Sequence, residues 1–238
     1  MSGWQLPAEG APSAPAAEDW VMPAPMAGGT RSVVRTGPSG LLLGTTRNER
    51  GETSSLAVRL FRNRPTRVFL AVPEYVSWVL AFRCVALGAH LTVLTGDPRR
   101  WGRLVRAVTD SGGSVDLLGP DGTPPGSGRP YRPSLVLDDV AHYDGSQAAL
   151  GPWQAVLVNE NAAASGAVFQ LRSCDMAVVG PCDARVTENL RRAYALGPRQ
   201  VRDCTALGQD EVVLAMPRRL LRVQVPPTPT EYGVLFRA

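Results

Sequence analysis

The hydrophobic and polar positions of residues 67–118 follow a repeating pattern. Apolar runs at 67–72, 90–95 and 114–118 are separated by amphipathic stretches at 73–88 and 98–112. Short continuous apolar runs that alternate with segments of helical period are typical of parallel strands buried on both faces and joined by helices. The pattern therefore predicts an α/β fold, a Rossmann-like or P-loop-like doubly wound, mostly parallel sheet.

Further elements flank this β-α-β-α-β unit on both sides. Apolar residues at 41–43 and 56–61 predict an N-terminal β-hairpin within 40–62, with the polar segment 47–51 as its turn. Downstream patterns predict strands at 134–139, 151–158, 175–179, 211–215 and 220–225 and a helix at 183–196. The predicted domains are a disordered Ala/Pro-rich leader at 1–36, one α/β domain at 37–226 with its core at 66–225, and a C-terminal tail at 227–238.

Composition narrows the chemistry that this domain can perform. All 25 basic residues are arginine, and neither lysine nor isoleucine occurs among the 238 residues, which is typical of GC-rich genomes such as those of actinobacteria. Without lysine there is no P-loop lysine for nucleotide phosphates and no Schiff-base lysine. Four scattered cysteines and two histidines show no zinc spacing. We therefore expect no metal site and no cofactor.

The net charge of +4 is modest, and the arginines are scattered along the chain. Because nucleic-acid binders usually concentrate basic residues and interleave aromatic ones, we expect no specific nucleic-acid binding. Contact with anionic lipid or with an acidic partner stays open. The longest apolar run, 76–89, is too short to cross a bilayer, and no signal-peptide pattern is present. These features predict a cytoplasmic location, with peripheral contact at the inner face of the membrane as a further option.

Acidic residues follow several of the predicted strands. The turn after the first parallel strand contains Pro73 and Glu74 where a nucleotide-binding unit would place glycines. Asp97 precedes Pro98 as a helix N-cap, and Asp138 and Asp139 end a strand in the manner of a Walker-B motif. Carboxyl ends of parallel strands are where ligands bind, so Glu74, Asp97, Asp138 and Asp139 are candidates for a ligand cleft. No catalytic residue is predicted.

The second predicted helix carries an arginine-rich surface. Its candidates for partner binding are Arg99, Arg100, Trp101, Arg103 and Arg106. One interpretation is a packed tryptophan beneath solvated arginines; the other is a binding face for a phosphate, a lipid or an acidic subunit.

Short patterns across residues 40–236 resemble a known group of proteins. They are Leu60-Phe61-Arg62, Pro65-Thr66-Arg67-Val68, Phe82-Arg83, Ala86-Leu87-Gly88-Ala89, Trp101, Leu150-Gly151-Pro152-Trp153-Gln154 and Pro229-Thr230-Glu231. The sequence resembles actinobacterial proteins associated with type VII (ESX) secretion loci. The order of elements also resembles an FtsK/SpoIIIE-type ATPase module, with 68–72 as the P-loop strand and 135–139 as the Walker-B strand.

The resemblance implies a module kept for assembly or regulation without ATP hydrolysis, because the nucleotide-binding lysine and glycines are absent. The resulting hypothesis is a non-catalytic component that contacts subunits of a secretion machine. The alternative is an enzyme or small-molecule binder that uses the strand-end acids. The residues alone leave the oligomeric state and the strand order open.

Overall fold

Six parallel strands form one half of the sheet in the computed structural model, which describes all residues except 1–20, 24–39, 48–50, 141–149, 209 and 238. They are β4 (Thr66–Ala71), β5 (His90–Thr95), β6 (Val115–Leu118), β7 (Ser134–Asp139), β8 (Gln154–Asn159) and β9 (Met176–Val179). Their order is β9-β4-β8-β7-β5-β6. The continuous valine and leucine runs of the central strands are buried on both faces, as the sequence pattern predicts.

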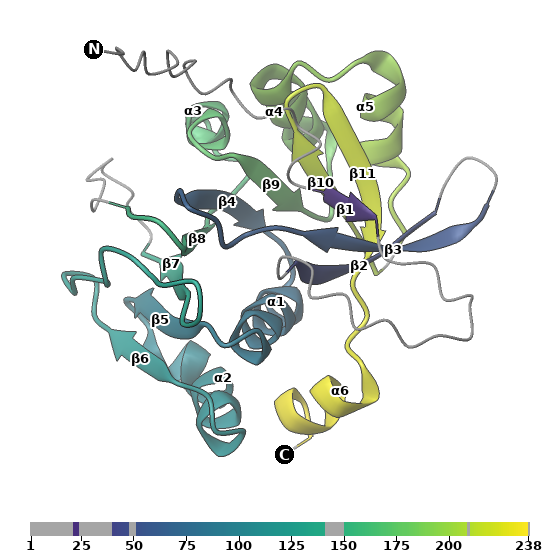
Figure 1. Ribbon diagram of the computed structural model, residues 1–238. Helices are drawn as coiled ribbons and strands as arrows, with labels where there is room; N and C mark the ends of the chain where they lie inside the picture. Colours follow the sequence, from purple (N-terminus) through teal and green to yellow (C-terminus); the bar gives the residue numbers. More distant parts are fainter. Residues whose placement is uncertain (1–20, 24–39, 48–50, 141–149, 209, 238) are drawn as a thin grey trace, which may run out of the picture.

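Antiparallel strands extend this sheet beyond β9 (Figure 1). They are β10 (Glu211–Met216), β11 (Arg219–Gln224), β2 (Leu41–Arg47), β3 (Thr53–Val58) and β1 (Val21–Pro23), in the order β10-β11-β2-β3-β1. The predicted N-terminal hairpin is β2–β3, and it belongs to the same sheet. The predicted α/β fold with a parallel core is confirmed.

Helices cover both faces of the sheet and form with it the two larger of three hydrophobic cores, the third being a small one around Val136 and Val156. One face carries α1 (Glu74–Ala86), α2 (Pro98–Asp110) and α6 (Pro229–Leu235), and the other carries α3 (Ala167–Arg172), α4 (Ala184–Tyr194) and α5 (Pro198–Thr205). Trp101 and Leu104 of α2 pack in the first core, and Leu171 of α3 and Leu190 of α4 pack in the second. This two-sided covering is what a doubly wound sheet requires.

The C-terminal segment differs from the predicted tail, because residues 229–235 form α6. Thr228 and Glu231 cap its N-terminus reciprocally, with Pro229 at the first helical position. Glu231 also forms a salt bridge with Arg83 of α1, with Nε and Oε1 2.6 Å apart. Phe236 stacks on Trp78 at a centroid distance of 5.9 Å. The chain therefore ends against the α1 face of the domain.

The predicted leader lies outside the described residues except for β1. This short strand pairs antiparallel with β3, with Val21 opposite Val58. Trp4 and Trp20 lie outside the described residues as well. Within the described ranges, no helix combines the length and the apolar character needed to cross a bilayer.

Candidate functional site

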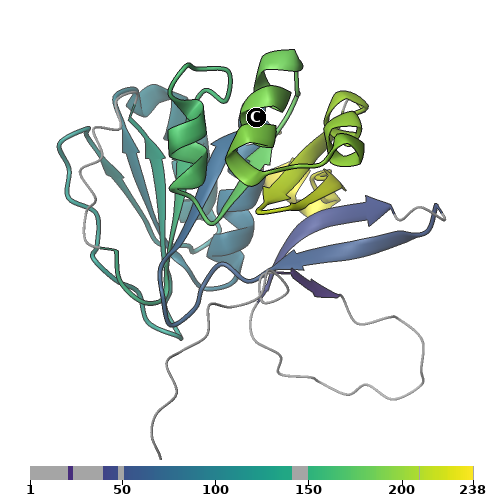
Figure 2. The ribbon, with the colours of Figure 1, turned by 90° about the horizontal axis from the view of Figure 1, so that it is seen from above.

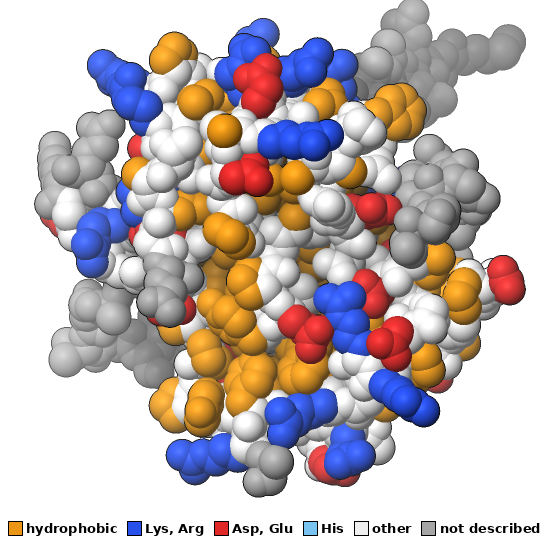
Figure 3. All heavy atoms as spheres, turned by 180° about the vertical axis from the view of Figure 1, so that it is seen from behind, with side chains coloured by type: hydrophobic (Ala, Val, Ile, Leu, Met, Phe, Trp, Pro, Cys, Tyr) orange, Lys and Arg blue, Asp and Glu red, His pale blue; other side chains and the backbone are white. Residues whose placement is uncertain are grey.

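A groove of ≈ 1220 Å³ lies where β4, β5, β7, β8 and β9 end. It is formed by the turns that leave these parallel strands, including Val72-Pro73 after β4 and Gly96-Asp97 after β5. Seen from behind, the molecule shows acidic and arginine side chains next to one another, beside an area of hydrophobic side chains (Figure 3). The groove lies at the carboxyl ends of the parallel strands, which is where doubly wound sheets bind ligands.

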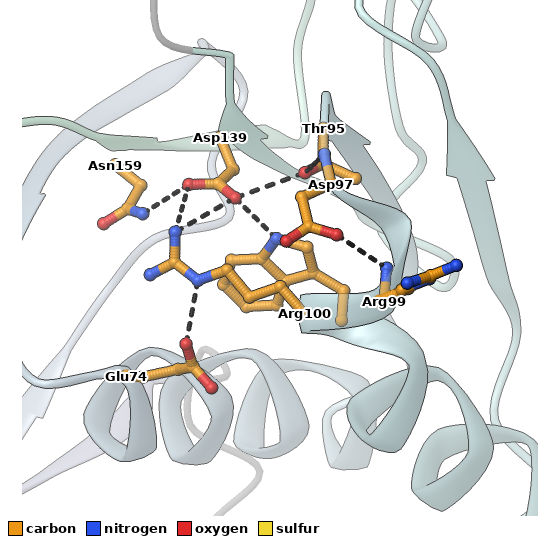
Figure 4. Close-up of polar contacts among 8 residues, drawn as sticks. Glu74, Thr95, Asp97, Arg99, Arg100, Asp139 and Asn159 are labelled. Atoms are coloured by element: carbon orange, nitrogen blue, oxygen red, sulfur yellow. Dashed lines mark hydrogen bonds and ion pairs between the residues drawn. The ribbon is translucent and has the colours of Figure 1, made fainter.

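Asp139, the last residue of β7, is the centre of a hydrogen-bond network in the groove (Figure 4). Its carboxylate accepts hydrogen bonds from Trp101 Nε1 at 2.6 Å and from Asn159 Nδ2 at 2.6 Å. Arg100 donates to both carboxylate oxygens, at 2.9 and 3.2 Å, and the Thr95 hydroxyl donates at 3.3 Å. The Asp139 side chain is 10% exposed, so its charge depends on these donors for stabilisation.

Arg100 joins this network to the start of α1. Its Nε lies 2.8 Å from Glu74 Oε2, while its terminal nitrogen binds Asp139. The guanidinium thus bridges the turn after β4 and the end of β7, and β8 is the strand between them in the sheet. The Arg100 and Glu74 side chains are 36% and 43% exposed, so their ion pair is weaker than the buried bonds to Asp139.

Asp97 also lines the groove, but it serves mainly as a helix cap. Its carboxylate accepts a hydrogen bond from the Arg99 amide at 3.1 Å, and its own amide donates to the Thr95 hydroxyl at 3.0 Å. These bonds fix the start of α2. The predicted N-cap role of Asp97 is confirmed.

Asp138, the other predicted strand-end acid of β7, does not line the groove, whereas Asp139 does. Successive residues of a strand point to opposite faces, and Asp139 occupies the groove side. Burial raises the pKa of Asp138, against the lowering effects of the Val140 amide and Arg67. The structure therefore places Asp97 and Asp139 in the lining of the groove and leaves Asp138 out. Glu74 is outside the lining too, but Arg100 links it to Asp139.

The predicted partner-binding residues of α2 lie in three different surroundings. Trp101 is fully buried, which agrees with the interpretation of it as a packed tryptophan beneath the arginines. Arg100 is directed into the groove network, as Figure 4 shows. Arg99, Arg103 and Arg106 are exposed and follow one another at helical spacing on one side of α2.

The turn after β4 contains none of the features that hold nucleotide phosphates in a P-loop. Pro73 has no amide hydrogen to donate, Glu74 carries negative charge, and no lysine exists in the chain. The N-terminus of α1 carries no side-chain cap. No group of three or more potential metal-ligating residues occurs among the residues that the structure describes.

Sequence reasoning did not identify Asn159 and Thr95 as members of the site. Each is the polar residue that ends an apolar strand, β8 and β5 respectively. That position was available as a signal, because the ends of parallel strands meet at one edge of the sheet. What the sequence lacked was the strand order, which places β8 beside β7.

Comparisons with known proteins identify a shared fold. No family model and no curated protein matches the sequence. Among solved structures, VirB4 of Thermoanaerobacter pseudethanolicus matches with a TM-score of 0.53 and 7% identity, covering 82% of this chain and 98% of that one. The cytoplasmic domain of EssC matches with a TM-score of 0.46 and 12% identity, covering 83% of this chain and 44% of the EssC chain. The chain thus has an α/β fold of the kind found in VirB4.

Proposed function

We propose that this protein is a non-catalytic structural or regulatory component of a protein secretion machine of the type VII (ESX) class. It acts through protein contacts at the cytoplasmic side of the membrane, as a single α/β domain that contains β1 and α6 as well as residues 37–226. The observation that carries this proposal is the Arg100 bridge between Glu74 and Asp139. In the FtsK/SpoIIIE-like arrangement, these residues lie where phosphate and its metal ion would be held.

The chemistry of this bridge disfavours nucleotide binding. A Walker-B acid supports Mg²⁺ with a free carboxylate, whereas Asp139 accepts hydrogen bonds on both oxygens. Hydrogen bonds to a charged group contribute about 1.5–3 kcal/mol each, so a metal would have to replace several such bonds. Glu74 would repel phosphate at the very helix start where a P-loop attracts it.

The association with secretion rests on two kinds of support. VirB4, whose fold this chain shares, is a secretion-system component. The sequence patterns over residues 40–236 resemble proteins of actinobacterial type VII loci. The fold alone is compatible with many activities, and the sequence patterns narrow them to this class.

The surface that we assign to partner binding is the exposed side of α2. Arg99, Arg103 and Arg106 present three positive charges there, with no acidic residue in the first turn of the helix. Three arginines against one exposed acid on the same side of the helix, Asp110 at its end, favour encounter with an acidic partner subunit.

Affinity purification of the tagged protein from a mild detergent extract of its host tests this function. We expect enrichment of a secretion ATPase or of membrane-core subunits, and loss of that enrichment when Arg99, Arg103 and Arg106 are all changed to glutamine. The matched control changes three exposed arginines of α4 and α5 to glutamine, namely Arg185, Arg199 and Arg202. Recovery of no secretion subunit by the unmodified sequence contradicts the proposal.

The second candidate function is binding of a small molecule, and the groove of ≈ 1220 Å³ is the observation that favours it. Ligand pockets of about 300–1,000 Å³ are usual, so the groove has sufficient space. A thermal-shift screen against a metabolite collection tests this candidate. A stabilising compound whose effect is lost in both Asp97→Asn and Asp139→Asn would favour it over the contact role.

A further inference from the structure

The two antiparallel hairpins of the sheet meet at one point and then separate. Strands β11 and β2 pair only through Gln224 and Thr45. Gly44 permits this crossing, because a Cβ there would lie 1.9 Å from the Gln224 carbonyl oxygen. Figure 2 shows the β2–β3 hairpin running away from β10 and β11 beyond the crossing.

A cavity of ≈ 400 Å³ occupies the opening between these strands, and we call it the β2–β11 wedge. Its lining residues are Thr45, Thr46, Arg47, Thr53, Asp203, Glu211, Leu220, Leu221, Arg222 and Gln224. The charged members are two arginines and two acids, and Arg222 pairs with Glu211. The wedge therefore offers threonines and strand backbone with no net charge, which disfavours a strongly charged ligand.

The register of β10 and β11 identifies which backbone groups face the wedge. The turn between the strands has two residues, so Met216 and Arg219 are the hydrogen-bonded pair that closes the hairpin. Hydrogen-bonded and non-hydrogen-bonded pairs then alternate along the strands. Leu220, Arg222 and Gln224 consequently direct their N–H and C=O groups away from β10.

Gln224 uses this outward edge to pair with Thr45 of β2. In the part of the chain that the structure describes, Leu220 and Arg222 have no strand partner on the same edge. Arg222 Nε is a further buried donor without a hydrogen-bond partner among these residues. The wedge thus combines an open strand edge with a side-chain donor that has no acceptor.

We propose that the β2–β11 wedge binds an extended segment of a partner protein, which adds a strand antiparallel to β11. The segment exchanges backbone hydrogen bonds with Leu220 and Arg222, as β2 does with Gln224. Main-chain bonds supply the affinity in this mode of recognition, and side-chain pockets supply the specificity. The threonine-lined wall formed by Thr45, Thr46 and Thr53 accommodates small or β-branched side chains of the segment.

This proposal deepens the proposed contact function and rests on it for its biological meaning. Its geometry is independent of the groove, because no residue of the wedge lines the strand-end site. ATP turnover by the pure protein would contradict the non-catalytic function and leave the strand-binding wedge intact. Failure of strand binding would contradict the proposed role of the wedge and would leave the function proposed from the strand-end groove unchanged.

Amide hydrogen exchange of the full-length protein tests the wedge directly. The probe is a short synthetic peptide of alternating threonine and valine residues with both ends capped. Before peptide is added, we expect the amides of Leu220 and Arg222 to exchange faster than those of Leu221 and Val223, which face β10. Saturating peptide should slow exchange at Leu220 and Arg222 by about tenfold or more, since each gains a backbone hydrogen bond.

Two chemical controls separate strand pairing from side-chain binding. The same peptide with alternate nitrogens methylated lacks the donors for one edge and should give no protection. Arg222→Pro removes the outward N–H, whereas Arg222→Ala keeps it, and both variants lose the bond to Glu211. We expect Arg222→Pro to bind the peptide at least about tenfold more weakly than Arg222→Ala.

Melting curves establish whether both variants are folded. If Arg222→Pro is unfolded, the exchange pattern of the unmodified protein decides whether the peptide pairs with β11. Equal peptide binding by the two variants, or no protection at Leu220 and Arg222, overturns the proposal. Protection that rises with protein concentration in the absence of peptide assigns the edge to a second copy of the chain, and also overturns it.

Discussion

Arg83 and Arg100 each hold carboxylates from distant segments, but their surroundings differ. Arg83 is 11% exposed and binds Glu231 at 10% exposure, and it also donates to the carbonyl oxygens of Leu42, Leu43 and Pro226. Arg100 is 36% exposed and borders the strand-end groove. A buried, fully bonded arginine fastens α6 to α1, whereas a half-exposed one links two carboxylates at the border of an open groove.

The comparison shows why a single residue type performs both tasks in a chain without lysine. The planar guanidinium can bind a carboxylate through two nitrogens while other N–H groups reach further acceptors. At Arg83 every such acceptor helps to hold α6 and its neighbouring segments against α1. At Arg100 the acceptors are Glu74 and Asp139, which belong to the start of α1 and the end of β7.

The largest effect on stability is expected when the buried pair of Arg83 and Glu231 is broken. Arg83→Met leaves Glu231 charged without its partner and frees three carbonyl groups, so we expect the free energy of unfolding to fall by about 3–5 kcal/mol. Chemical denaturation measures this change. The double variant Arg83→Met with Glu231→Gln is the control, and it should recover part of the loss because no buried charge remains unpaired. A change below about 1 kcal/mol in Arg83→Met would contradict the structural role.

Acid should weaken the same Arg83–Glu231 contact to a smaller extent, because protonation of Glu231 removes only the charge-dependent part of the interaction. Burial opposes ionisation of Glu231, yet the Arg83 guanidinium and the Thr228 amide hold its pKa below the ordinary value of 4.5. A lowered pKa in the folded state gives stability that is present above pH 4.5 and is lost as the pH falls through the folded value. Denaturation across this range should show a shallower dependence on pH in Glu231→Gln than in the unmodified protein.

The next largest effect on stability is expected from a change in the hydrogen-bond network of the groove. Asp139→Asn keeps the shape but removes the charge that Arg100 and Trp101 bind, so we expect a loss of about 1–3 kcal/mol in the free energy of unfolding. Asp138→Asn is the matched control, because burial already raises the pKa of Asp138 and its charge contributes less. Equal losses in the two variants would mean that Asp139 has no special place in the site.

The smallest effect is expected at the exposed end of the bridge. Glu74→Gln removes the ion pair with Arg100, in which the Glu74 side chain is 43% exposed. Surface pairs of this kind contribute less than about 1 kcal/mol, so the stability should hardly change. A loss as large as that of Asp139→Asn would show that the two halves of the bridge are equally important.

The apolar runs determined most of the fold in advance. The boundaries of β5 and β7 match the predicted 90–95 and 134–139, and the other parallel strands differ by only a few residues. Helix α6 was missed because Pro226, Pro227 and Pro229 suggested an irregular exit. Its capping box was nevertheless present in the sequence, since Thr228 and Glu231 have the required spacing.

The site was harder to predict than the fold, because it depends on which strands are neighbours. Asp138 and Asp139 are consecutive acids with similar sequence surroundings, and only the sheet decides which one faces the groove. The sequence left Trp101 open between a packed residue and part of a binding face, and it could not show that the indole N–H donates to Asp139. Long-range contacts of this kind leave no periodic pattern in the sequence.

Nucleotide turnover by the pure full-length protein tests the central claim most directly. With ATP and Mg²⁺ in excess, we predict no phosphate release above that of buffer and no heat of nucleotide binding in calorimetry, because Arg100 already binds Asp139 and the chain contains no P-loop lysine. Asp110→Asn, a change at an exposed acid at the end of α2, serves as the matched control for Asp139→Asn. Phosphate release that Asp139→Asn abolishes and Asp110→Asn retains would contradict the account.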